Sequence, residues 1–211
     1  MLHSYGDPSR EYSYEYFNFY QTLRQLGYEV ELFDYAGEIR SAGREAMNQK
    51  LLCRVKEWQP ALALFSLYTD QFDSSVIEEL RQHTKTLCFF HDDTWRVEYS
   101  RNWARHFDYF TTPDVYGELK YREIGLPNAI YFPFGCNEQI FRKLDIARKY
   151  DVSFVGARHP YREWLIERIR KAGIQVEVAG YRWPGGEIDQ ESMVRFFNES
   201  RINLNLSNSA S

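Results

Sequence analysis

A strand, a glycine and a helix start follow one another at residues 152–160, and this order limits the folds open to the chain. Val152–Val155 is an apolar stretch of the buried-strand type, Gly156 ends it, and Pro160 stands where a helix begins. This order is typical of the first strand-turn-helix unit of a nucleotide-binding sheet. An α/β pattern already precedes it and closes in an apolar segment that runs into Gly135. The sequence therefore predicts one α/β domain followed by the opening of a second.

The part of the chain before Gly135 alternates between strand and helix patterns. Gly27 follows a helical period, and Pro60 follows another, as expected at helix ends. We expect helices at residues 14–26, 42–58, 74–82 and 115–124, and strands at residues 28–33, 61–67, 86–90, 107–111 and 129–132. This βαβα order predicts a parallel sheet with helices on both faces, a Rossmann-type domain over residues 1–140.

The second unit repeats the pattern over a shorter length. A helix runs from Pro160 to just before Gly173, Asp189 caps a helix through Phe197, and further strands are expected at residues 176–179 and 202–206. Three strands and two helices do not complete a doubly wound domain. We therefore expect residues 150–211 to be the truncated start of a second Rossmann-type domain, in the N-terminal portion of a longer protein.

Composition excludes several functional classes. The net charge is −4 and no long basic run is present, which argues against a nucleic-acid partner. The apolar run at residues 61–67 is far too short to span a membrane, and the N-terminus shows no charged-then-apolar leader. Three widely spaced cysteines indicate reduced thiols and a cytoplasmic location. Aromatic residues make up 17%, which favours a ring-rich core over a dedicated carbohydrate or base site.

Several stretches together resemble one known family. They are YSYEYFNFYQTLRQLGYEVELFDY, FFHDDTWR, YFPFGCNEQIF, YDVSFVGARHPYRE and RINLNLSNSAS. In this order they are similar to CgeB-like glycosyltransferases, the spore-maturation-protein type, across nearly the whole chain. The strongest pieces are YFPFGCN and DVSFVGARHPYR.

The resemblance implies a GT-B architecture: an acceptor-side N-terminal domain, a donor-binding C-terminal domain and a nucleotide sugar, such as a UDP- or GDP-sugar, held in the cleft without a bound metal or cofactor. The chain departs from the pattern at both ends. Its first strand is cut short, and the donor half after Ser211, with its expected carboxylate, is missing.

The segment around Gly156 is the predicted donor-phosphate site. Glycine lets the backbone approach a ligand, and the helix start at Pro160 presents free N–H groups and a positive dipole end. Arg158 and Arg162 are expected to bind the diphosphate through paired hydrogen bonds. The alternative is that both arginines lie on a solvated helix face.

The second candidate group is His91, Asp92 and Asp93. The adjacent carboxylates look like the metal motif of a different transferase class, which we reject because the pair lies in the first domain, away from the phosphate site. A general base that takes the proton of the acceptor hydroxyl is the better role. The alternative is that Asp93 caps the helix after Trp95.

Ligands of parallel sheets bind at the carboxyl ends of the strands. Five residues that follow predicted strands at this edge are candidates for binding the acceptor or lining the cleft: Tyr5, Gly6, Asp7, Tyr68 and Asp70.

We therefore expect an enzyme of the hexosyltransferase type that moves a sugar from a nucleotide diphosphate to the hydroxyl of a glycan or other acceptor. Two alternatives stay open: a non-catalytic nucleotide- or sugar-binding module, and a sugar-nucleotide epimerase. The 211-residue chain is expected to be inactive alone, and its open sheet edge is a place for homo-oligomer formation.

Overall fold

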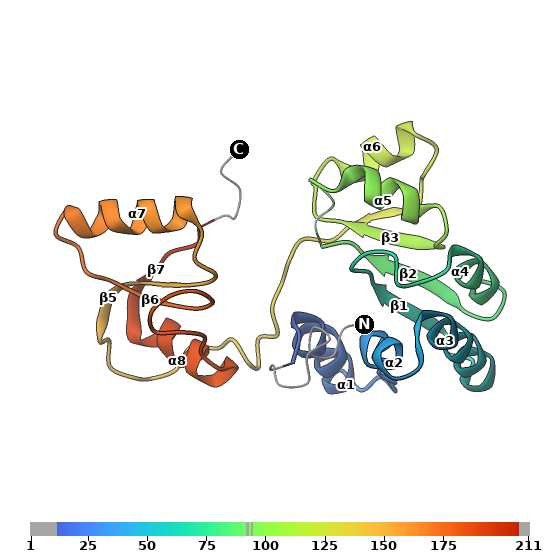
Figure 1. Cartoon of the computed structure of the whole chain (residues 1–211), viewed down its shortest axis with the longest axis horizontal. Helices are drawn as coiled ribbons and strands as arrows, with labels where there is room; N and C mark the ends of the chain where they lie inside the picture. Colours follow the sequence, from blue (N-terminus) through green and yellow to red (C-terminus); the bar gives the residue numbers. More distant parts are fainter. Residues whose placement is uncertain (1–11, 92, 94, 207–211) are drawn as a thin grey trace. The chain divides into compact units, whose positions relative to one another are not determined.

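The computed structural model describes residues 12–91, 93 and 95–206. The chain divides into two compact units, Met1–Gly135 and Cys136–Ser211, which are treated separately below (Figure 1). Each contains its own parallel sheet.

The first unit has a four-stranded sheet in the order β1-β2-β3-β4, with every pair parallel. Its strands are β1 (Leu62–Ser66), β2 (Lys85–Phe89), β3 (Tyr109–Thr112) and β4 (Ala129–Tyr131). The connecting helices are α4 (Ser74–Leu80), α5 (Val97–Ala104) and α6 (Gly117–Glu123). Before β1 come a π-helical segment (Tyr16–Tyr20), α1 (Gln21–Gln25), α2 (Tyr35–Ala42) and α3 (Arg44–Trp58). The predicted alternation of strands and helices is confirmed from residue 62 onward.

The strand predicted at residues 28–33 is wrong. This stretch belongs to neither a helix nor a strand. Alternation of apolar and polar residues selects a face, but a strand also needs a neighbour for its N–H and C=O groups. Within the described part of the first unit, the sheet contains β1 to β4 and no ladder to this stretch.

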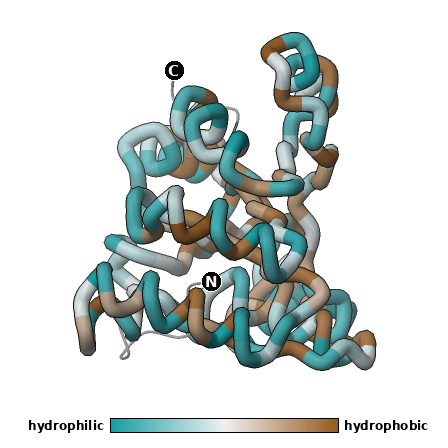
Figure 2. The backbone as a smooth tube through the Cα atoms, turned by 90° about the vertical axis from the view of Figure 1, so that its right-hand side faces the viewer, coloured by the Kyte–Doolittle hydropathy of each residue, from teal (hydrophilic) through white to brown (hydrophobic). Residues whose placement is uncertain are grey.

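Apolar side chains from the helices and the sheet form the core of the first unit. Met47 of α3, Ile77 and Leu80 of α4, and Phe110 of β3 have no exposed surface. Hydrophilic and hydrophobic segments alternate along the helices in Figure 2, as expected for helices that bury one face. The core thus fixes the positions of the strand ends from which the site residues emerge.

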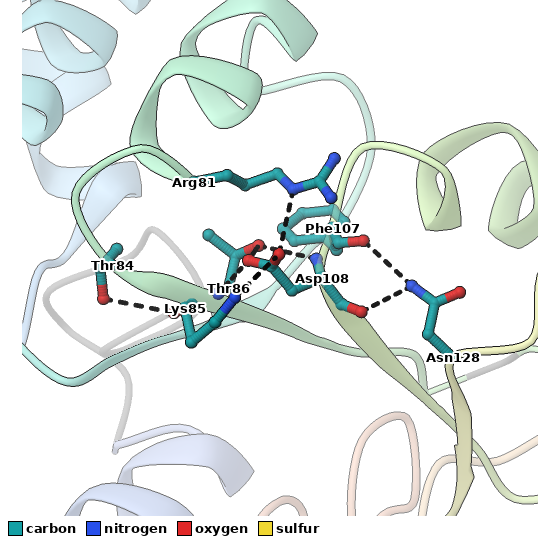
Figure 3. Close-up of polar contacts among 7 residues, drawn as sticks. All are labelled: Arg81, Thr84, Lys85, Thr86, Phe107, Asp108 and Asn128. Carbon is teal, nitrogen blue, oxygen red and sulfur yellow. Dashed lines mark hydrogen bonds and ion pairs between the residues drawn. The ribbon is translucent and has the colours of Figure 1, made fainter.

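A partly buried carboxylate ties β2 to β3 at the end of the sheet where these strands begin (Figure 3). Asp108 Oδ2 accepts from the N–H and the hydroxyl of Thr86 at 3.0 and 3.1 Å, and Arg81 Nε donates to Oδ1 at 3.3 Å. Asn128 Nδ2 donates to the carbonyl of Asp108 at 2.6 Å. Burial by itself raises the pKa of Asp108, but the bonds from Thr86 and Arg81 outweigh it and lower the pKa below its ordinary value.

Replacing Asp108 with asparagine is expected to destabilise the first unit by about 1–3 kcal/mol at neutral pH, because the ion pair with Arg81 is lost and an amide NH2 group replaces one of the two acceptor oxygens. The folded-state pKa is lowered, so this stabilisation is present above about pH 4, the unfolded value of an aspartate. It should decline as the pH falls through the folded-state pKa. Urea denaturation across this pH range measures both effects.

Glu29→Gln is the control, since it removes an exposed carboxylate of the same unit and should leave the free energy of unfolding nearly unchanged. An equal loss in both variants would contradict the role of Asp108.

The second unit has a three-stranded parallel sheet in the order β6-β5-β7. Its elements are β5 (Tyr150–Val155), α7 (Pro160–Lys171), β6 (Val176–Ala179), α8 (Gln190–Glu199) and β7 (Ser200–Asn203). The predicted cap is confirmed, since the side chain of Asp189 accepts from the N–H of Ser192 at 2.6 Å. The last strand begins two residues earlier than predicted and ends at Asn203, although the N–H of Leu204 still donates to Ser153.

A small core holds the second unit together. Phe154, Ile166, Val176 and Trp183 are buried against one another. The α/β class with parallel sheets, as predicted, is confirmed in both units. Among the helices described, none is both long enough and apolar enough to cross a membrane.

Candidate functional site

Three polar side chains of the first unit meet at the carboxyl ends of β1 and β2. Ser66 ends β1, His91 follows β2, and Glu15 comes from the helical segment near the start of the described chain. Ser66 Oγ donates to Glu15 Oε1 at 2.8 Å. His91 Nε2 lies 3.1 Å from the same carboxylate oxygen and 2.9 Å from Ser66 Oγ. These three residues, the histidine cluster, come from segments that are far apart in the sequence.

The carboxylate of the histidine cluster is buried and the imidazole is partly exposed. The side chain of Glu15 is 4% exposed and that of His91 is 26% exposed. Burial by itself raises the pKa of Glu15, but the hydrogen bonds with His91 and Ser66 oppose it, and the pKa is lowered. Glu15 is therefore held in its ionised form, and the imidazole is the member that a substrate can reach.

Aromatic rings surround the imidazole. The ring of Phe89 lies 4.7 Å from that of His91 at 90°, and the rings of Tyr14 and Phe134 lie 5.9 and 6.3 Å away. Phe132, which packs against Phe89 at 5.7 Å, and Phe134 are 43% and 55% exposed. An exposed aromatic surface thus borders the histidine, of a kind that stacks against the flat face of a sugar or another ring.

Asp93 contacts a different part of the unit. Its buried carboxylate accepts a hydrogen bond from the hydroxyl of Tyr121 on α6. Burial, followed by this bond, raises the pKa of Tyr121. The capping hypothesis is wrong, because Arg96 occupies the cap position of α5 and makes no side-chain cap bond. Asp93 instead ties the loop that carries His91 to α6.

Tyr68 and Asp70 lie on the loop after β1. Their backbone carbonyls accept from Arg96 Nη1 at 3.1 Å and from Arg44 Nε at 2.8 Å. The ring of Tyr68 is 63% exposed, and Asp70 lines a hollow of about 430 Å³ together with Arg44 and Asp73. Within the described residues, neither side chain forms a hydrogen bond or ion pair with the histidine cluster. The predicted residues Tyr5, Gly6, Asp7 and Asp92 lie outside that part of the chain.

In the second unit, the loop between β5 and α7 is bonded to the loop after β6. The N–H of Gly156 donates to the carbonyl of Ala179 at 3.0 Å, and the N–H of Arg158 donates to Tyr181 at 2.8 Å. Trp183, which is buried, donates its indole N–H to the carbonyl of Gly156 at 2.8 Å. These bonds give the loop after β5 a defined shape at the carboxyl edge of the sheet.

Gly180 makes the closest approach in this loop pair. A Cβ atom added to it would meet the carbonyl carbon of Gly156 at 2.8 Å, closer than real Cβ contacts come. Its φ of +126° also belongs to the region that glycine favours. Gly180 is therefore required for the two loops to pack.

Helix α7 begins immediately after this loop. Pro160 occupies its first turn, and the cap residue His159 makes no side-chain bond to the helix. The first amides of a helix have no intrahelical acceptor and attract anions. The start of α7 therefore presents amides without an intrahelical acceptor, whereas the N–H groups of Gly156 and Arg158 in the loop before it are already bonded to the loop after β6.

The predicted Arg158 lies beside this helix start. Its guanidinium forms an ion pair with Glu163 in the first turn of α7 and lies over the Trp183 ring, 5.8 Å from the centroid. Its side chain is 40% exposed. An anion can thus reach Arg158, in competition with Glu163.

Arg162 is engaged differently. Its guanidinium donates to the carbonyl of Leu206 at 2.8 and 3.2 Å and to that of Ala157 at 2.9 Å, and it lies over the ring of Phe154. Burial lowers its pKa. Arg162 therefore connects the loop after β5 to the segment after β7.

Sequence reasoning missed Glu15 and Gly180. Glu15 is the single charged residue in the aromatic run at residues 12–20, and a lone carboxylate among rings was an available signal. Nothing in the sequence shows that Gly180 packs on Gly156, because that contact joins two strand ends.

Comparison with known proteins bears on the second unit. No curated protein matches the chain. Residues 158–211 match a family model described as glycosyl transferase-like, and the match starts at Arg158, in the loop that precedes α7. From this residue onward, the second unit is glycosyl transferase-like in sequence.

Proposed function

We propose that the chain is part of a CgeB-like, GT-B-type glycosyltransferase that moves a sugar from a nucleotide diphosphate to an acceptor hydroxyl. The observation that carries the proposal is the glycosyl transferase-like match, which begins at Arg158. This residue lies in the loop before α7, and the N-terminus of that helix suits a diphosphate. The donor in this proposal is a nucleotide sugar, and neither a metal nor a cofactor takes part.

The second unit is proposed to bind the diphosphate of the donor. The first amides of α7 supply N–H donors, and Arg158 supplies a charge that is partly exposed. Arg162 donates to backbone carbonyls, so its proposed contribution is to hold the loop in place. When the bond between the sugar and the diphosphate breaks, these groups stabilise the negative charge on the leaving group.

The first unit is proposed to bind the acceptor and to supply the base. Of the described candidates, His91 combines partial exposure with a fixed orientation, whereas Asp93 is buried and bonded to Tyr121. In the reaction, the acceptor oxygen forms a bond to the anomeric carbon, the diphosphate leaves, and the hydroxyl proton passes to the imidazole. The rings of Phe132 and Phe134 are proposed to stack against the acceptor.

Replacing Arg158 with alanine is expected to weaken binding of a nucleoside diphosphate by about 1.5–3 kcal/mol, the range for hydrogen bonds to charged groups. That is roughly a 10- to 150-fold increase in Kd. Calorimetry on the full-length protein with UDP, GDP and their sugars measures this Kd and identifies the nucleobase of the donor. Glu163→Gln frees Arg158 from its ion pair and should tighten binding.

Arg168→Ala is the matched control, since it removes an exposed guanidinium from the same helix, in its last turn. Equal weakening of nucleotide binding in Arg158→Ala and Arg168→Ala would mean that the loss of one positive charge, and not a specific contact of Arg158, causes the effect. If no nucleotide binds, the transferase proposal fails. Binding without sugar transfer to any hydroxyl acceptor would favour a non-catalytic binding module.

A further inference from the structure

Two groups converge on one oxygen of Glu15. Ser66 Oγ donates to Oε1 at 2.8 Å, and His91 Nε2 lies 3.1 Å from the same atom. An ionised carboxylate can only accept hydrogen bonds. A bare Nε2 would place its lone pair against the carboxylate, so the geometry requires a proton on Nε2.

The proton on Nε2 determines what the other ring nitrogen can do. A neutral imidazole carries one N–H, so Nδ1 is left with a lone pair. Among the described residues, none forms a hydrogen bond with Nδ1 of His91, and the side chain of His91 is 26% exposed. The nitrogen that is free of the cluster is therefore the one able to take a proton from a substrate.

Ser66 could not itself serve as a nucleophile in this arrangement. It is 3% exposed, and its hydroxyl proton is directed to Glu15. The same nitrogen, Nε2, contacts both Ser66 and Glu15. In a catalytic triad, by contrast, one ring nitrogen contacts the serine and the other contacts the carboxylate. The cluster is thus built to orient the histidine.

Two features of Glu15 point to a role beyond packing. Its second oxygen, Oε2, is buried without a hydrogen-bond partner in the described part of the chain, which is costly for a carboxylate. It also directly precedes the π-helical segment Tyr16–Tyr20, and such segments are rare and frequent at functional sites. If Glu15 only filled space in the core, an apolar side chain would do so at a lower cost in free energy.

We propose that Glu15 is the positioning residue of His91: it holds the imidazole proton on Nε2 and so keeps Nδ1 available as the base. This inference rests on the proposed transferase function for its kinetic consequence. The tautomer of His91 itself depends on residues of the first unit alone.

The decisive variant is Glu15→Met, which keeps an unbranched chain of similar length and removes the acceptor. The hydroxyl of Ser66 then loses its partner and is expected to donate to Nε2, which moves the imidazole proton to Nδ1. Two-bond ¹H–¹⁵N spectra of the 211-residue chain labelled at histidine report this tautomer directly. We expect the ratio of the Nε2–H to the Nδ1–H form to fall by about tenfold or more, the effect of roughly one good hydrogen bond.

Two further variants separate this role from a folding defect. In Glu15→Met/Ser66→Ala the competing donor is gone, so the Nε2–H form should recover even though the side-chain contacts of the cluster are lost. In Glu15→Gln an acceptor oxygen remains, and the Nε2–H form should persist. Melting temperatures of all variants check that the first unit stays folded.

The kinetic arm uses the full-length protein. For Glu15→Met, kcat should fall by about tenfold or more, in step with the loss of the Nε2–H form, while KM changes by less than about threefold. Glu15→Gln should lie between wild type and Glu15→Met. A wild-type imidazole that carries its proton on Nδ1, or an unchanged tautomer and kcat in Glu15→Met, would overturn the inference. If the wild-type protein transfers no sugar, the proposed function fails, and the tautomer spectra still decide the role of Glu15.

Discussion

Gly180→Ala is expected to destabilise the second unit by about 2–5 kcal/mol. About 1–2 kcal/mol comes from placing a Cβ at a positive φ, and about 1–3 kcal/mol from overpacking. The new methyl group would overlap the backbone of Gly156, which cannot rotate away as a side chain can. Hydrogen exchange of the β5 and β6 amides measures the free energy of opening for this unit without separating it from the first.

Gly173→Ala is the control for the backbone conformation. Gly173 has a φ of +86° and nothing within 4 Å of the position that a Cβ would take, so only the strain of the backbone applies. The loss there should be about 1–2 kcal/mol. A loss at Gly180 no larger than at Gly173 would show that the contact with Gly156 does not hold the two loops together. The first unit should keep its protection in both variants, because its core is separate.

His91→Asn is expected to lower kcat for sugar transfer by roughly 10²–10⁴ in the full-length protein, since a positioned general base contributes about this factor. Asparagine keeps a polar side chain near Glu15 but cannot take up the proton of the acceptor hydroxyl. Binding of the nucleotide diphosphate should be unchanged, because the proposed donor groups belong to the second unit. Steady-state kinetics and calorimetry on the same preparation measure the two quantities.

His83→Asn serves as the matched control, since His83 is an exposed histidine of the same unit. Its kcat should equal that of wild type. Equal kcat in His91→Asn and wild type would remove His91 from the reaction, and Asp92 would become the next candidate to test. Loss of nucleotide binding in His91→Asn would instead indicate that the histidine contacts the donor.

The sequence alone determined the α/β class, the order of most elements and the position of the second strand-turn-helix unit. These follow from local chemistry: apolar runs specify strands that are buried on both faces, Pro160 marks a helix start, and Asp189 marks a cap. The polar segments at the carboxyl ends of the strands could be located for the same reason. The strand expected at residues 28–33 failed because a strand exists only with a partner, and a local pattern does not show the partner.

The tertiary structure alone decided which polar residues act together. Asp93 follows His91 by two positions, yet it contacts Tyr121, while His91 contacts Glu15, 76 positions away. Likewise, Arg158 and Arg162 are four positions apart, but one faces Glu163 and the other donates to Leu206. A hydrogen bond is directional and short, so it depends on the final positions of strand ends and helix faces, which many distant residues set jointly.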